Sequence, residues 1–157
     1  MLRFQHHIAP SRIPMAGKGL FTKEAVNRGR VLIIPNQRHQ LYSARELAGF
    51  ASDSIEMLSS LRWFEDVHTI DPEWSEESHL NHSFNPNCLW HLGFVFALID
   101  INPDDELTID YGHLLDEHTV LDFRDSLTGR EIRGLKWEEK MLRTAGQLQQ
   151  LFGPAKF

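Results

Sequence analysis

The sequence contains one cysteine, Cys88, among its 157 residues. A single thiol excludes an intramolecular disulfide and any zinc site built from several cysteines, and it suits a reducing compartment. No apolar run approaches the length of about 18 residues that a transmembrane helix needs. The first residues also lack the apolar segment of a signal peptide. We therefore expect no membrane partner and no covalent cross-link within the chain.

Positive charge is also scarce. The chain has 22 acidic and 16 basic residues, which gives a formal net charge of −6 and a pI of about 5.8. Affinity for nucleic acid comes from lysine and arginine side chains that displace counterions from phosphates, so no direct nucleic-acid partner is expected. An acidic surface suits a basic polypeptide partner. The alternative is that the charge only keeps the protein soluble.

The length is that of one domain with its own core. Alternating or β-branched runs predict strands at residues 3–8, 31–34, 94–99 and 107–109. The run at 94–99 is continuously apolar, which predicts a buried strand. Short strands with one helical insertion and a helical end are typical of an α+β, mostly β fold.

Helical patterns occupy two stretches. Ser43 and Glu46 form a capping-box pattern at the start of the first one, which covers residues 44–61 and is interrupted at Gly49 and at residues 52–54. The chain is expected to turn helical again after Phe123, with its strongest helix-forming composition at residues 137–151.

Two segments separated by an apolar run carry side chains suited to one site, and a glycine-containing segment precedes them. In chain order they read Gly17-Lys18-Gly19-Leu20-Phe21, Asn81-His82-Ser83-Phe84-Asn85-Pro86-Asn87 and Glu106-Leu107-Thr108-Ile109-Asp110-Tyr111-Gly112. This ordered set resembles the signature of the SET-domain lysine methyltransferases, and the resemblance covers residues 4–137. It implies a SET-like fold of short curled β-sheets with a knot-like C-terminal segment and a helical tail. The implied division is a catalytic domain at 1–122, with an inserted helical segment at about 43–80, and a tail at 123–157.

The resemblance also implies a site for S-adenosylmethionine. Its cofactor-binding residues are expected to be Lys18, Gly19, Leu20, Asn81, His82 and Tyr111, and Tyr111 is the catalytic residue. A phenol oxygen can accept weak C–H···O contacts from a polarised methyl group and orient it. An amide such as that of Asn81 offers both a donor and an acceptor. The alternatives are a core tyrosine bonded to a backbone carbonyl, an Asx turn before Pro86, and a plain glycine turn.

The end of the chain departs from the family pattern. Many members have a cysteine-rich tail that binds zinc beside the site, and every one of those cysteines is missing here, so we expect a fold without metal. Phe123 and Trp137 are the expected anchors of the tail. Either ring could cover the cofactor's adenine, or both could only pin the tail to the core. Ile109 and Phe96 are expected to line the substrate channel.

These inferences predict an enzyme that methylates lysine in a protein substrate with a basic, lysine-containing segment, for which a histone-like protein is one candidate. The expected location is the cytoplasm, with secretion into a host cell or a nuclear location as alternatives, and a homodimer is left open. One rival is a catalytically silent SET-like module that binds basic polypeptides. Another is a metal enzyme built from the nine histidines, which lack a ligand spacing such as His-Glu-x-x-His.

Overall fold

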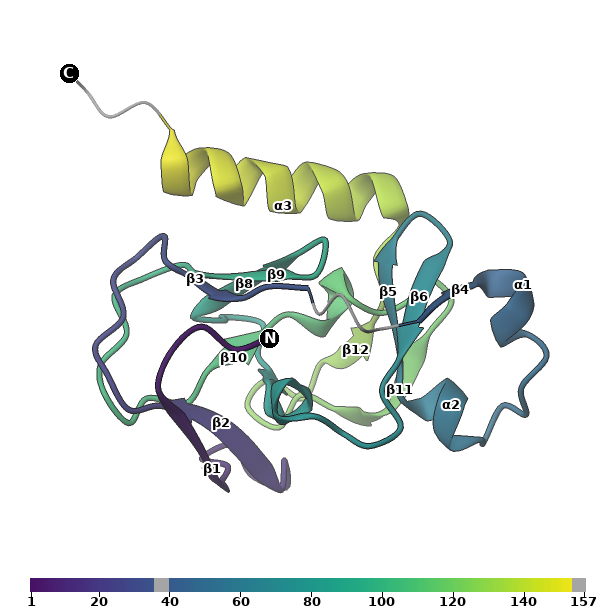
Figure 1. The fold of residues 1–157 in the computed structure, drawn as a ribbon, viewed down its shortest axis with the longest axis horizontal. Helices are drawn as coiled ribbons and strands as arrows, with labels where there is room; N and C mark the ends of the chain where they lie inside the picture. The colour runs from purple at the N-terminus through teal and green to yellow at the C-terminus, as the bar shows by residue number, and fades with distance from the viewer. Residues whose placement is uncertain (36–39, 154–157) are drawn as a thin grey trace.

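The computed structural model describes residues 1–35 and 40–153. Over these residues the chain is mostly β: the strands form small sheets of two or three strands each, and only one helix exceeds a single turn (Figure 1). The predicted fold class is confirmed. None of the helices in the described segments is both long and apolar enough to cross a lipid bilayer.

A three-stranded antiparallel sheet borders the main core. It consists of β3 (Val31–Ile33), β9 (Phe94–Ala97) and β8 (Cys88–His91) in that order. Successive side chains of a strand point to opposite faces, so Val95 and Ala97 are buried whereas Phe94 is 39% exposed. The prediction of a strand buried along its whole length was therefore wrong, because only one face of β9 meets the core and the strand ends before Ile99.

The hairpin β1 (His6–Pro10) and β2 (Lys18–Thr22) lies at another edge of the molecule. The first strand begins and ends later than the predicted 3–8. From Gly19 onward β2 is buried, because the C-terminal signature segment packs against it: the backbone N–H of Leu107 donates to the carbonyl of Leu20. This packing brings the Gly-x-Gly element to the signature segments.

The segment at about 43–80, expected to be a helical insertion interrupted at Gly49 and at residues 52–54, is mainly a small sheet. Two single-turn helices, α1 (Ala44–Leu47) and α2 (Ile55–Leu58), flank the breaks, and the capping box of Ser43 and Glu46 is confirmed. Each helix stops after one turn, because the interrupting glycine and serines leave too few residues to offset helix nucleation. The rest of the segment forms the sheet β4-β6-β5 and a 3-10 turn: β4 (Leu41–Ser43), β6 (Val67–Ile70), β5 (Ser60–Phe64) and η1 (Glu76–His79).

The two signature segments run side by side. The two-residue strands β7 (Asn81–His82) and β10 (Thr108–Ile109) pair in parallel, and the 3-10 turn η2 (Tyr111–His113) follows β10 directly. Residues that are 29 positions apart are therefore joined: the N–H of Tyr111 donates to Nδ1 of His82 at 3.1 Å. This pairing assembles the candidate site.

The tail is a hairpin followed by one long helix. The hairpin strands are β11 (Val120–Arg124) and β12 (Glu131–Arg133), so the expected helical turn after Phe123 was wrong. Helix α3 (Trp137–Phe152) begins where predicted and lies across the sheet of β8 and β9 (Figure 1). The predicted domain boundary falls within β11, residues 154–157 of the predicted tail lie outside the described residues, and the division stays a prediction.

Candidate active site

A buried carboxylate, that of Glu106, joins the separate parts of the site. Its Oε1 accepts hydrogen bonds from Ser11 Oγ at 2.7 Å and from Asn81 Nδ2 at 2.8 Å, and its Oε2 accepts from the backbone N–H of Arg12 at 2.7 Å. The side chain is 8% exposed, and several donors are what a buried charge requires. One anion thereby holds the β1–β2 loop against strand β7.

Asn81 uses its amide N–H groups within the protein. Besides Glu106, Nδ2 contacts the carbonyl oxygen of Lys18 at 2.9 Å and Ser11 Oγ at 3.2 Å. Among the contacts of the described residues, this leaves the amide oxygen Oδ1 as the group that can accept a hydrogen bond from a ligand. Asn81 therefore positions the start of β2 and retains one acceptor.

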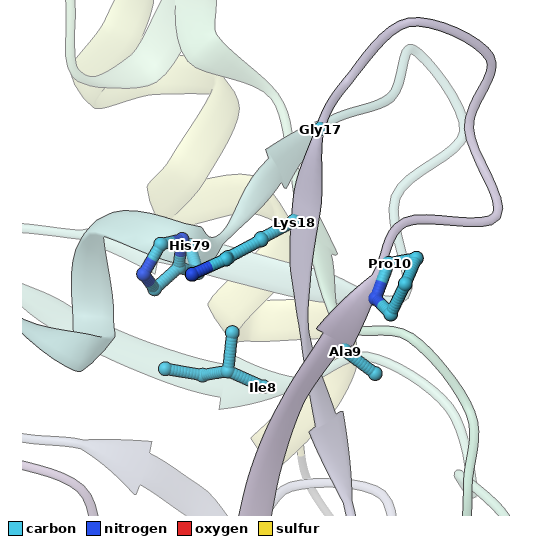
Figure 2. A pocket seen from close by; sticks show the side chains of 6 residues that line it. All are labelled: Ile8, Ala9, Pro10, Gly17, Lys18 and His79. Carbon is cyan, nitrogen blue, oxygen red and sulfur yellow. The ribbon is translucent and has the colours of Figure 1, made fainter.

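A cavity of about 320 Å³ opens beside this network, lined by Ile8, Ala9, Pro10, Gly17, Lys18 and His79. Figure 2 shows the Lys18 side chain extending toward the ring of His79 over the apolar floor that Ile8 provides. The volume lies at the lower end of the range of about 300–1,000 Å³ for small-molecule sites. The cavity combines a cationic end with an apolar wall, so it suits a ligand that has both an anionic and an apolar part.

His82 is 6% exposed and faces inward. Its Nδ1 accepts the N–H of Tyr111, so the ring proton resides on Nε2, which is buried and has no hydrogen-bond partner among the described residues. Burial lowers the pKa of His82 below its ordinary value, although Asp110 and Asp125 oppose the shift. The imidazole is therefore neutral at physiological pH and acts as a fixed acceptor for the backbone of Tyr111.

Tyr111 lies at the centre of the signature pairing. Its hydroxyl donates to the carbonyl oxygen of Leu80 at 2.7 Å, and its ring lies 5.3 Å from that of His82 between centroids. Burial, with a smaller contribution from the Glu106 carboxylate, raises the pKa of Tyr111 to about 12. The phenol is neutral near pH 7, so it can orient a partner but cannot serve as a general base.

Two of the expected site residues lie in the core. The side chain of Leu20 is fully buried, and that of Ile109 is 2% exposed within the main core cluster. Leu20 therefore supports the site through its backbone. Ile109 lies beside His82 in the β7–β10 pairing. Its side chain packs in the core, so core packing explains its position without a substrate channel.

The three aromatic residues expected at the site differ in their surroundings. Phe96 packs against Phe152 of α3, with 5.9 Å between ring centroids. Trp137 lies under the guanidinium of Arg62, and Phe123 is 52% exposed on β11. Among the described residues, the ring contacts of Phe96 and Trp137 therefore include Phe152 and Arg62, respectively. Sequence patterns give no direction for a side chain on a hairpin or at a helix start, so they could not predict these partners.

The sequence patterns missed the backbone and loop contributions to the site. Leu80, Ser11 and Arg12 contribute a carbonyl, a hydroxyl and a backbone N–H, and none of them belongs to a recognisable motif. Glu106 opens the second signature segment, which was the one available signal for it. Within the described parts of the chain, no group of three or more His, Cys, Asp or Glu side chains could hold a metal ion.

Comparison with known proteins gives a family match. The family model described as "SET domain" matches residues 17–112, which is more than half of the 157 residues. A curated protein from Halocynthia roretzi, "Histone-lysine N-methyltransferase SETD7", is 27% identical over 154 residues, covering 89% of this chain and 38% of that protein. The chain thus spans well under half the length of this relative.

Solved structures show the same fold. An apo form of ctPRC2 with two substitutions in Ezh2 matches with a TM-score of 0.56 and 17% identity. A form of ctPRC2 described as autoinhibited and bound to S-adenosylmethionine matches with a TM-score of 0.51 and 16% identity. Each match covers 98% of this chain and 23% of the other chain.

Proposed function

The chain belongs to the SET-domain family, and from this premise we propose that it transfers methyl groups from S-adenosylmethionine to lysine side chains of a protein substrate. The observation that carries the proposal is the parallel pairing of β7 with β10. That pairing brings the Tyr111 hydroxyl and the Leu80 carbonyl oxygen to within 2.7 Å of each other beside the Asn81–Glu106 network.

The residues around the cavity fit the amino-acid end of this cofactor. Lys18 supplies a cation for a carboxylate, and Asn81 Oδ1 supplies an acceptor for an ammonium group. Gly17 has a positive φ of 72° and open space where a Cβ would lie, so its backbone permits close approach. When bound, S-adenosylmethionine supplies an activated methyl group on a sulfonium sulfur.

Tyr111 has an orienting role in this proposal. Its proton is directed to the Leu80 carbonyl, so the lone pairs of the phenol oxygen can accept C–H···O contacts. A pKa of about 12 keeps the hydroxyl protonated, so the substrate amine must lose its proton to another acceptor before it reacts. Alignment of the reacting groups, rather than acid–base chemistry at Tyr111, is then the main contribution of the protein.

The charge of the chain supports a basic substrate segment. A net charge of −6 disfavours nucleic acid and favours association with a lysine-containing polypeptide, for which histone-like proteins are one example. A cytoplasmic location and a homodimer remain predictions that the charge does not address.

A silent binding module is the second candidate function. It is favoured by the hydrogen bond from Tyr111 to a backbone carbonyl, which a purely structural core tyrosine would also form. Such a module would bind the basic polypeptide and could bind the cofactor, but it would not transfer the methyl group.

Calorimetry with S-adenosylhomocysteine, followed by radiolabel transfer from the methyl-labelled cofactor onto a basic protein, tests these functions in turn. We expect saturable binding that Asn81→Ala weakens by about 1–3 kcal/mol, since a buried polar network loses its partner. Asn85→Ala, at an exposed position in the same loop, is the matched control. Absence of binding would refute the cofactor assignment, and binding without transfer to any basic protein would favour the silent module.

A further inference from the structure

The tail hairpin meets the candidate site in two places: β12 packs against η2, and a cation from the hairpin turn contacts the segment Asn81–Asn87. The guanidinium carbon of Arg130 lies 4.0 Å from the centroid of the Phe84 ring, well within the distance of about 6 Å at which a cation is attracted to an aromatic face. Phe84 in turn meets the His82 ring edge to face, with 4.4 Å between centroids. A series of contacts thus connects Arg130 to the imidazole that accepts the Tyr111 N–H.

The turn that carries Arg130 is held by its own hydrogen bonds. Oδ1 of Asp125, a residue that is 4% exposed, accepts from both the N–H and the hydroxyl of Thr128. The hydroxyl oxygen of Thr128 accepts from the N–H of Arg130 at 3.3 Å, and Gly129 adopts a φ of 67°, which glycine accommodates without strain. The turn therefore holds the backbone of Arg130 independently of the contact between its side chain and Phe84.

We propose that Arg130 is a positioning residue for this site: its guanidinium fixes the Phe84 ring against His82 and so maintains the alignment of β7 with Tyr111. This inference rests on the proposed methyltransferase function. The tail has no cysteines with which a metal could tie it to the segment Asn81–Asn87. In addition to the contacts that β12 makes with η2, the Arg130–Phe84 contact connects the hairpin turn to that segment. Neither Phe123 nor Trp137 makes it.

The charge of Arg130 also acts on His82. Oδ1 of Asp110 lies 3.9 Å from Nδ1 of His82. Burial and the Arg130 charge lower the pKa of His82, whereas the charges of Asp110 and Asp125 raise it. Removal of the guanidinium charge should therefore raise the pKa of His82. A change in hairpin stability alone would not produce that shift while Asp125 remains in place.

The test compares Arg130→Gln, Arg130→Lys and the control Arg133→Gln, which lies in the same hairpin but pairs with Glu131. Two quantities are measured on each folded variant: the pKa of His82 by NMR in the ligand-free protein, with the resonance assigned from its loss in His82→Gln, and steady-state methyl transfer. We expect Arg130→Gln to raise the pKa of His82 and to lower kcat/KM by about two- to fivefold, the scale of an exposed cation–π contact. Arg130→Lys should retain most of both, and Arg133→Gln should change neither.

A double-mutant cycle with Phe84→Leu isolates the contact. If the Phe84 ring transmits the effect, Arg130→Gln should have no further effect on kcat/KM in the Phe84→Leu background. An unchanged His82 pKa in Arg130→Gln, or equal losses of kcat/KM in the two backgrounds, would overturn the proposal. An inactive wild-type protein would refute the methyltransferase function, and the His82 titration would still register the contact in that case.

Discussion

Gly19 leaves free the space that the Glu106 carboxylate occupies. A Cβ added to Gly19 would lie 2.3 Å from Oε1 of Glu106, the oxygen that accepts hydrogen bonds from both Ser11 and Asn81. A side chain at the second glycine of the Gly-x-Gly element would therefore have to displace a buried, hydrogen-bonded carboxylate, independently of any ligand. The element and the second signature segment are two halves of one packed arrangement.

We expect Gly19→Ala to lower the free energy of unfolding by about 1–3 kcal/mol, the usual cost of overpacking, and to weaken cofactor binding because Glu106 must move. Gly146 in α3 has nothing within 4 Å of an added Cβ. Gly146→Ala, the control, should stabilise the protein by up to about 1 kcal/mol, because alanine favours a helix interior. Urea denaturation measures both. Equal effects of the two substitutions would show that Glu106 does not restrict position 19.

Tyr111→Phe should lower kcat by about 10²-fold, the scale expected when reacting groups lose their alignment, while the affinity for S-adenosylhomocysteine changes only a few fold. The hydroxyl contributes to the transition state more than to the bound ground state, so kcat falls rather than KM rising. Tyr42→Phe, in which the altered ring packs on Phe50 instead, should leave kcat unchanged. A Tyr111→Phe variant with wild-type kcat would identify Tyr111 as a core tyrosine.

The sequence was informative where chemistry is concentrated in short motifs. Asn81, His82 and Tyr111 were each expected at the site, and the β7–β10 pairing brings them together. Leu80 and Arg12 were missed because they contribute backbone groups, which any residue type possesses. Their partners, moreover, are 31 and 94 positions away in the chain, a separation that local patterns do not encode.

The tail was the least predictable part for a related reason. The residues after Phe123 have no strand pattern of their own, and they form a hairpin because the turn from Asp125 to Gly129 closes on itself. Of the predicted aromatic anchors, Trp137 stacks with Arg62 and Phe123 is half exposed. Arg130, a residue type usually assigned to solvent, makes the contact with Phe84. Exposure and charge alone do not reveal a cation–π partner.

Treatment with EDTA should leave both the melting temperature and the activity unchanged. The chain has a single, fully buried cysteine, and the tail is held by hydrogen bonds, by the buried Ile132 and by ring contacts such as Arg130–Phe84 and Arg62–Trp137. Thermal unfolding with and without the chelator, followed by readdition of zinc, measures this directly. A marked fall in melting temperature that zinc restores would contradict the prediction.

The stability of the protein should rise between about pH 8 and pH 10 because of Lys140. This side chain is 1% exposed, and its Nζ donates to the Leu115 carbonyl at 3.1 Å. Burial, together with the nearby Arg62 charge, lowers the pKa of Lys140 to about 8 from 10.5. In this window the unfolded chain keeps the proton that the native chain has lost, so the free energy of unfolding increases with pH, by about 1.4 kcal/mol per unit at most.

Lys140→Met removes the titrating group and should abolish this increase, whereas Lys136→Met, at an exposed position beside the start of the same helix, should preserve it. Urea denaturation of the three proteins from pH 7 to pH 10 measures the difference in slope. The window must end near pH 10, because the raised pKa of Tyr111 has the opposite effect above that pH: the unfolded phenol loses its proton first, and stability then falls. Parallel stability curves for the wild type and Lys140→Met below pH 10 would show that the amine is hydrated in the native state, and the buried contact between α3 and Leu115 would then be wrong.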